Sequence, residues 1–215
     1  MMALERGALL FDLDGTLTDN YAGIAACIRH ALCELGAPDP GAESLKRCMG
    51  PPLRESFSSL LDTTDAGRIE QALVHYRTRY RDVGWRENVP YDGIDAALGA
   101  LAARGERLIL CTSKPAVYAR RILAHFRLDR HFSAQYGADL AGTLDDKRTL
   151  MAHIVAHEDL APAACTMIGD RHHDLRAARA HGVRAVGVLW GFGSRDELAG
   201  ADALAEHPDE LPAIL

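Results

Sequence analysis

The 215-residue sequence contains no long run of basic residues and no long run of apolar residues. Its basic runs do not exceed a pair such as Lys46–Arg47, and its net charge is −6, so neither nucleic acid nor an anionic membrane is an expected partner. The first apolar stretch, Gly7–Phe11, is too short for the core of a signal peptide or for a membrane span. We therefore expect a cytoplasmic protein.

Cysteine is also scarce and is spaced irregularly. The five cysteines are Cys27, Cys33, Cys48, Cys111 and Cys165, an odd number without a CxxC pair. This pattern argues against a disulfide framework and against a zinc site. We expect buried free thiols in a reducing compartment.

The residues that are present suit a globular enzyme, with 48% hydrophobic and 25% charged residues. Four apolar runs predict buried strands, namely Gly7–Phe11, Leu108–Cys111, Thr166–Ile168 and Val183–Leu189. Helical periodicity fills the segments between them after residue 91. This alternation predicts an α/β fold with a doubly wound, Rossmann-like parallel sheet.

The stretch from Asn20 to Pro90 contains no convincing strand and shows helical faces instead, such as Ile24, Ile28 and Leu32. We therefore predict two domains: an α/β core formed by residues 1–18 and 91–215, and an all-helical insert formed by residues 19–90.

Polar residues follow three of the predicted strands. These are Asp12-Leu13-Asp14-Gly15-Thr16, then Thr112-Ser113-Lys114, then Gly169-Asp170 with Asp174 four residues later. The carboxyl ends of parallel strands share one edge of a sheet, so four carboxylates are expected in one pocket. Each pair would repel by about 4 kcal/mol at an effective dielectric of 20. Hard oxygen ligands without a nearby Cys pair favour Mg²⁺ as the compensating cation.

A phosphate group would also find donors at this edge. The Thr112 hydroxyl, the Ser113 backbone N–H and the following helix N-terminus can donate hydrogen bonds to phosphate oxygens. Lys147, at the start of a predicted helix, is the expected cationic partner for the same oxygens.

These motifs, in this order, resemble the haloacid dehalogenase superfamily of phosphatases over essentially the whole chain. The helical insert is similar to the small helical cap of that family. Three segments resemble its phosphoglycolate phosphatase branch: Gly50-Pro51-Pro52-Leu53, Val89-Pro90-Tyr91-Asp92-Gly93 and Trp190-Gly191-Phe192-Gly193-Ser194. Lys147 departs from that branch because Arg148, rather than proline, follows it.

The resemblance implies a role for each motif residue. Asp12 would be the nucleophile that forms an aspartyl-phosphate, and Asp14 the general acid and then the general base. Mg²⁺ would be held by Asp12, by the backbone carbonyl of Asp14, and by Asp170, with Asp174 supporting it directly or through water. Thr112 and Lys147 would bind the phosphoryl group.

The expected substrate is a small phosphorylated metabolite, either phosphoglycolate or a 5′-nucleotide, bound to a monomer or homodimer. Arg54, and next Arg47, are the candidate substrate contacts in the cap. A sugar-phosphate mutase keeps the same motifs, and a phospho-accepting signalling domain uses similar residues. Asp14 argues against a dehalogenase, which has no leaving oxygen to protonate. The roles of Lys114, His172 and His173 stay open.

Overall fold

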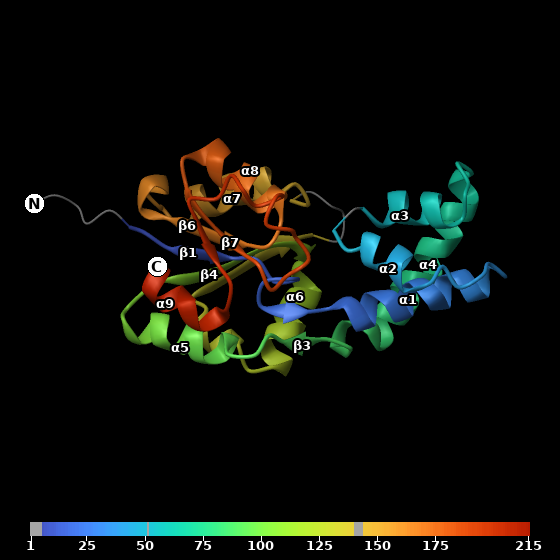
Figure 1. Cartoon of the computed structure of the whole chain (residues 1–215), viewed down its shortest axis with the longest axis horizontal. Coiled ribbons are helices and arrows are strands. Elements are labelled where there is room, and N and C mark those ends of the chain that lie inside the picture. Colours follow the sequence, from blue (N-terminus) through green and yellow to red (C-terminus); the bar gives the residue numbers. More distant parts are fainter. Residues whose placement is uncertain (1–5, 51, 140–143) are drawn as a thin grey trace, which may run out of the picture. The chain divides into compact units, whose positions relative to one another are not determined.

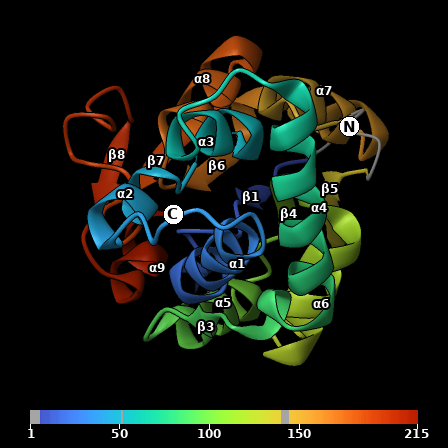
Figure 2. The same cartoon turned by 90° about the vertical axis from the view of Figure 1, so that its right-hand side faces the viewer.

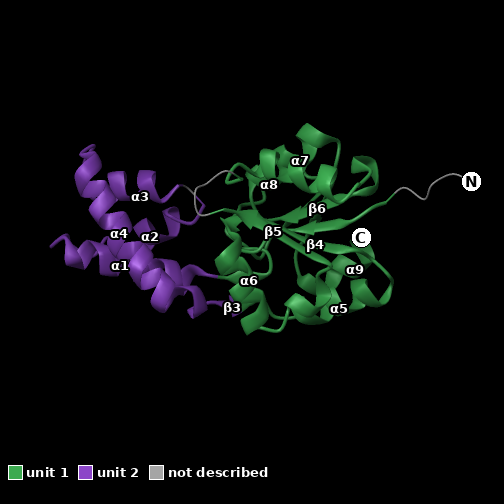
Figure 3. Cartoon of the chain, turned by 180° about the vertical axis from the view of Figure 1, so that it is seen from behind, with its two compact units in different colours: residues 1–19, 90–215 green, residues 20–89 purple. Residues whose placement is uncertain are grey.

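The computed structural model describes residues 6–50, 52–139 and 144–215, so Pro51 of the Gly50–Leu53 turn lies outside the described residues. The chain divides into two compact units (Figure 3). One unit comprises the chain up to Asp19 together with Pro90–Leu215, and the other is Asn20–Val89. These limits differ by one residue from the expected boundaries. That the second unit serves as a cap stays a prediction.

The first unit is built on a six-stranded sheet in the order β5-β4-β1-β6-β7-β8, and neighbouring strands pair in parallel. The strands are β1 (Leu9–Phe11), β4 (Leu108–Pro115), β5 (Ala134–Ala138), β6 (Thr166–Gly169), β7 (Arg184–Val188) and β8 (Ala203–Ala205). The chain order reverses on either side of β1, which makes this the switch point where ligands bind in such sheets. The predicted doubly wound α/β fold is confirmed.

Helices cover both faces of this sheet, as Figure 1 shows. Helices α7 (Lys147–His157) and α8 (His172–His181) lie on one face, and α5 (Ile94–Ala103), α6 (Ala116–His125) and α9 (Leu211–Ile214) on the other. Because both faces are covered, every residue of β1 is buried, which explains its continuous apolar run. Helix α8 ends at His181, and Gly182 follows it in the left-handed conformation with φ +67°.

The second unit is helical. It contains α1 (Tyr21–Glu34), α2 (Ala42–Arg47), α3 (Leu53–Leu60) and α4 (Ala66–Asp82), and α3 packs alongside α4 (Figure 2). Phe57 and Tyr76 meet edge to face between these two helices, with ring centroids 6.2 Å apart. The short strands β2 (Thr18–Asp19) and β3 (Val89–Pro90) form a separate two-stranded sheet.

Several details differ from the expectations. Strands β5 and β8 and helices α2 and α3 were not predicted individually. The segments of β5, β8 and α2 are short, whereas α3 carries a helical period in Leu53, Phe57 and Leu60. Cys33 is exposed, which contradicts the expectation of five buried thiols, whereas the other four are buried and all five are free. Among the described residues, none of the helices has the length and apolarity needed to cross a bilayer.

Candidate active site

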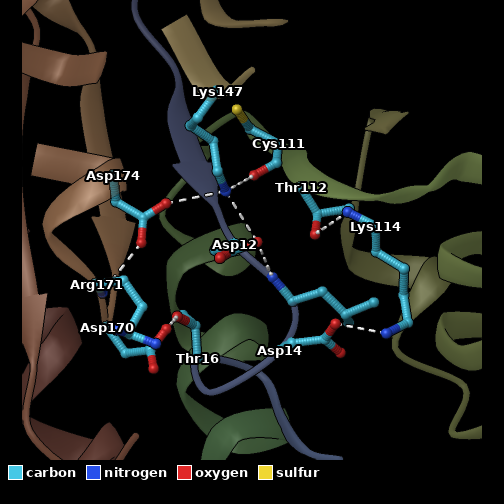
Figure 4. A network of polar contacts seen from close by, with 11 residues as sticks. Asp12, Asp14, Thr16, Cys111, Thr112, Lys114, Lys147, Asp170, Arg171 and Asp174 are labelled. Carbon is cyan, nitrogen blue, oxygen red and sulfur yellow. Dashed lines mark hydrogen bonds and ion pairs between the residues drawn. The ribbon is translucent and has the colours of Figure 1, made fainter. Parts of the chain in front are cut away.

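The carboxyl ends of β1, β4 and β6 bring the predicted polar residues together at one edge of the sheet (Figure 4). Asp12 follows β1 and Asp170 follows β6. Thr112 lies within β4, which continues to Pro115 instead of ending at Cys111 as predicted. Lys147 reaches the same place from the first turn of α7. Residues from four distant parts of the sequence therefore converge on one site.

Asp12 is held by its neighbours on both sides. Its backbone N–H donates to the Ile168 carbonyl at 3.0 Å, which continues the β1–β6 ladder. Its Oδ1 accepts a hydrogen bond from the Leu13 N–H at 2.8 Å and lies 2.9 Å from the Lys147 Nζ. The side chain is 14% exposed, so the carboxylate is fixed in orientation yet still open to a ligand.

Lys147 is a buried ammonium surrounded by oxygen atoms. Its Nζ lies 2.9 Å from carboxylate oxygens of both Asp12 and Asp174 and donates to the Cys111 carbonyl at 2.9 Å. Burial lowers the pKa of Lys147, but the two carboxylates outweigh burial and hold that pKa above its ordinary value. The residue is therefore a permanent cation at neutral pH.

Asp170 and Asp174 complete an acidic cluster with Asp12. One carboxylate oxygen from each residue lies within 4.8 Å of the others. Burial, followed by repulsion from Asp174 and Asp12, raises the pKa of Asp170 to about 8. Burial also raises the pKa of Asp174, although Lys147 opposes that shift. Three carboxylates facing one lysine leave an excess of negative charge, so this set of hard oxygen donors fits a divalent cation.

Asp14 lies on the other side of the site from this cluster. Its Oδ2 accepts a charge-assisted hydrogen bond from the Lys114 Nζ. Its Oδ1 is buried, with no hydrogen-bond partner among the described residues. Burial raises the pKa of Asp14, and the pairing with Lys114 opposes that rise. A carboxyl group with one paired and one unpaired oxygen is suited to exchanging a proton with a ligand.

Thr112 and Ser113 differ in their surroundings. Thr112 is buried, and its Oγ1 accepts a hydrogen bond from the Lys114 N–H at 3.3 Å. Ser113 is exposed. Both lie next to the start of α6, but their binding of a phosphoryl group stays a prediction.

The loop of residues 190–194 supports the site. In the sequence, this segment was recognised only by its resemblance to the phosphoglycolate phosphatase branch. The Phe192 N–H donates to Asp170 Oδ2 at 2.8 Å, and the Trp190 Nε1 donates to the Thr16 carbonyl at 3.0 Å. Gly15 is required here, because it has φ +80° and a Cβ on it would lie 2.1 Å from Asp170 Oδ2.

Helix α8 begins with a clamp that the sequence did not reveal. The N–H of Arg171 donates to Asp174 Oδ2 at 3.2 Å, so Asp174 also caps the N-terminus of α8. His172 and His173 do not diverge as adjacent helix residues are expected to, because their ring centroids lie 3.9 Å apart. The Nδ1 of His172 also lies 2.8 Å from Glu197 Oε1.

The two arginines proposed as substrate contacts lie in the helical unit. Arg54, on α3, forms an ion pair at 2.5 Å with Glu70 on α4. Arg47, at the end of α2, donates to the Ser44 hydroxyl at 3.0 Å. Both are exposed. Their contact with substrate stays a prediction.

Similarity to known proteins agrees with this geometry. The model of the haloacid dehalogenase-like hydrolase family matches residues 9–188. A Pseudomonas aeruginosa protein named 5′-nucleotidase is 47% identical over 196 residues, covering 91% of this chain and 88% of the relative. A phosphoglycolate phosphatase from Colwellia psychrerythraea is 29% identical over 208 residues, covering 92% of this chain and 91% of the relative.

One further relative is named as a kinase, and one similar protein has a solved structure. The Mycobacterium tuberculosis protein named tyrosine-protein kinase PtkA is 41% identical over 188 residues, covering 87% of this chain and 64% of the relative. The crystal structure of a predicted phosphatase from Clostridium acetobutylicum superposes with a TM-score of 0.88 at 36% identity, covering 99% of this chain and 98% of that chain.

Proposed function

The chain belongs to the haloacid dehalogenase-like hydrolase family, and on that premise we propose that it is a Mg²⁺-dependent phosphatase of small phosphate monoesters. The observation that carries this proposal is the placement of two carboxylates at one strand end. Asp12 is fixed beside a buried ammonium, and Asp14 follows two residues later with one carboxylate oxygen that has no hydrogen-bond partner in the described part of the chain. One group is placed to attack and the other to move a proton.

The reaction proceeds in two displacements. First, an Asp12 carboxylate oxygen attacks phosphorus, the bond from phosphorus to the leaving oxygen breaks, and Asp14 gives that oxygen a proton. Asp14 then takes a proton from water, whose oxygen attacks the aspartyl-phosphate and releases inorganic phosphate. Covalent catalysis thereby divides one difficult step into two easier ones. The positive charge of Lys147 stabilises the phosphoryl oxygens in both steps.

The metal would be held by Asp12, Asp170 and the backbone carbonyl of Asp14, with Asp174 supporting it. When bound, Mg²⁺ neutralises charge on the transferring phosphoryl group. The acidic cluster supports this assignment, because its carboxylates repel one another and a divalent cation would offset that repulsion. The raised pKa of Asp170, which is caused first by burial and then by Asp174 and Asp12, is consistent with such a site.

The relatives favour a 5′-nucleotide over phosphoglycolate as the substrate. The relative named 5′-nucleotidase is 47% identical to this chain, whereas the phosphoglycolate phosphatase is 29% identical. A phosphotransferase is a second candidate function, because the relative named as a tyrosine kinase is 41% identical. The two functions share the attack by Asp12 and differ in the phosphoryl donor and acceptor.

Trapping the phosphoenzyme tests the proposal. The purified protein is mixed with Mg²⁺ and a panel of 5′-nucleotides, phosphoglycolate and ATP, with no bisphosphate activator present, and free phosphate is measured. We expect phosphate from a monoester, a transient phosphoryl adduct on Asp12 by mass spectrometry, and a loss of several orders of magnitude in Asp12→Asn. Near-normal turnover by a folded Asp12→Asn protein would overturn the covalent mechanism. Transfer from ATP to tyrosine without monoester hydrolysis would favour the second function.

A further inference from the structure

Lys114 is aimed into the site by a distortion of β4. The pairing of β4 with β5 shifts register between Thr112 and Pro115, which marks a bulge in the strand. Bulges next to active sites commonly redirect a side chain. Gly137 on β5 permits the distortion, because a Cβ there would lie 2.5 Å from the Lys114 carbonyl oxygen. The side chain of Lys114 is only 6% exposed, so burial constrains its orientation.

The two lysines of the site serve different carboxylates. Lys147 pairs with Asp12 and Asp174, whereas Lys114 pairs with Asp14 (Figure 4). Figure 4 shows Lys114 reaching Asp14 from the β4 side, away from the Lys147 ammonium. The proposed nucleophile and the proposed proton-transfer group therefore each have a cation of their own.

The ion pair with Lys114 constrains the orientation of the Asp14 carboxylate. Asp14 lies beyond the end of β1 at Phe11, and its backbone forms an isolated bridge with Thr18. These backbone contacts do not fix the orientation of the Asp14 side chain. The Lys114 ammonium engages Oδ2 and leaves Oδ1 without a hydrogen-bond partner among the described residues. One oxygen is thus anchored, and the other stays available for a proton.

We propose that Lys114 is a positioning residue that holds the Asp14 carboxyl group in the orientation from which it protonates the leaving oxygen. This inference rests on the proposed phosphatase mechanism. Its consequence depends on the substrate. An alkyl phosphate needs its leaving oxygen protonated as the bond to phosphorus breaks, whereas 2,4-dinitrophenyl phosphate releases a stable anion without a proton. A residue that binds phosphoryl oxygens directly would affect both substrates alike.

Single-turnover formation of the phosphoenzyme in Mg²⁺ distinguishes these roles. We expect Lys114→Met to slow phosphoryl transfer from an alkyl phosphate by about 10²-fold while changing transfer from 2,4-dinitrophenyl phosphate less than about threefold. Asp14→Asn should show the same selectivity. The double variant Lys114→Met with Asp14→Asn should be no slower than Asp14→Asn alone, because both changes remove one function. Lys114→Arg should restore part of the alkyl rate.

Controls address folding and charge. Lys46→Met removes an exposed lysine that pairs with Glu43 on α2, and it should leave both rates unchanged. Lys114→Gln serves as the neutral variant if Lys114→Met fails to fold by circular dichroism. Equal slowing of both substrates, or additive losses in the double variant, would overturn the positioning role while leaving the phosphatase mechanism intact. Absence of any phosphoenzyme in the wild-type protein would instead overturn the proposed function and this inference with it.

Discussion

A single lysine supplies the positive charge beside the proposed nucleophile. Lys147 is 5% exposed and lies 2.9 Å from both Asp12 and Asp174. Taking these charges out of water is costly, and only their mutual pairing offsets that cost. Lys147 therefore supports the fold of the metal-free protein as well as the chemistry.

Replacing Lys147 tests this double role. Lys147→Met leaves two carboxylates facing each other without a cation, so the unfolding free energy of the metal-free protein should fall by about 3–5 kcal/mol. The turnover rates of a 5′-nucleotide and of an aryl phosphate should both fall, because Lys147 is proposed to stabilise the phosphoryl group that the two substrates have in common. Denaturant unfolding in chelator and steady-state kinetics measure these effects. A stable variant that spares either substrate would contradict the role given to Lys147.

Protonation of Asp170 predicts how metal binding depends on pH. Its pKa is raised from 3.8 to about 8, so the stabilising contribution of the neutral carboxyl is full below pH 3.8 and is lost progressively as the pH rises through about 8. Mg²⁺ must displace this proton, so its apparent affinity should rise about tenfold per pH unit below the pKa.

Thermal melting with and without Mg²⁺ measures that dependence. The rise in Tm caused by millimolar Mg²⁺ should be larger at about pH 8.5 than at about pH 6.5, because a ligand stabilises by RT ln(1 + [L]/Kd). Asp170→Asn should abolish most of the rise. A rise that is equal at the two pH values would show that Asp170 does not hold a proton that the metal displaces.

At the scale of elements, the start of α8 determines the spacing of two proposed metal ligands. Glu197 Oε1 accepts hydrogen bonds from Arg171 Nε at 2.8 Å and from the His172 N–H at 3.0 Å. These two residues lie between Asp170 and Asp174. The pKa of Glu197 is lowered to about 2; burial opposes that shift, and the hydrogen bonds from His172 and Arg171 outweigh it. Glu197 therefore anchors the segment that carries both carboxylates.

Glu197→Gln should loosen this anchor without touching the reacting atoms. Outer partners of metal ligands commonly contribute ten- to hundredfold to metal affinity, so we expect the half-saturating Mg²⁺ concentration to rise about tenfold. The rate at saturating Mg²⁺ should change little. Glu206→Gln is the matched control, because Glu206 also pairs with an arginine, Arg195, but in an exposed ion pair. An unchanged Mg²⁺ requirement in Glu197→Gln would contradict the anchoring role.

At the scale of the whole molecule, the division into two units suggests a division of labour. The strand ends of the first unit carry chemistry that any phosphate monoester can use. Selectivity must then come from groups that meet the leaving alcohol, and the helical unit is the expected source of those groups. Arg54 is the first candidate there.

Arg54→Ala should lower kcat/KM for the preferred substrate by about ten- to hundredfold and for an aryl phosphate much less, because a charge-assisted hydrogen bond is worth about 1.5–3 kcal/mol. Arg77→Ala provides a matched control, since Arg77 and Arg54 both pair with Glu70. If both variants lose the same activity, the effect comes from Glu70 and the stability of the helical unit. If Arg54→Ala lowers both substrates equally, Arg54 does not select the leaving group.

The sequence alone determined the fold class and which polar residues follow each predicted strand. Buried strands covered on both faces must be apolar throughout, and the polar residues that follow them must meet at one edge of a parallel sheet. These are local patterns joined by one topological rule, so Asp12, Thr112 and Asp170 could be placed near one another without coordinates. Strand β5 lacks such a pattern because Gln135 and Gly137 interrupt it, and the apolar run of β8 is only three residues long.

Only the tertiary structure decided which charge meets which. Lys114 and Asp14 lie 100 residues apart, and their contact depends on a bulge in β4 that no local signal announces. The hydrogen bond from Arg171 Nε to Glu197 likewise joins residues that lie 26 positions apart in the sequence. The energy of an ion pair varies steeply with distance and burial, and both quantities exist only after the chain has folded. The sequence therefore determined which groups are available for catalysis, and the tertiary structure determined their pairing.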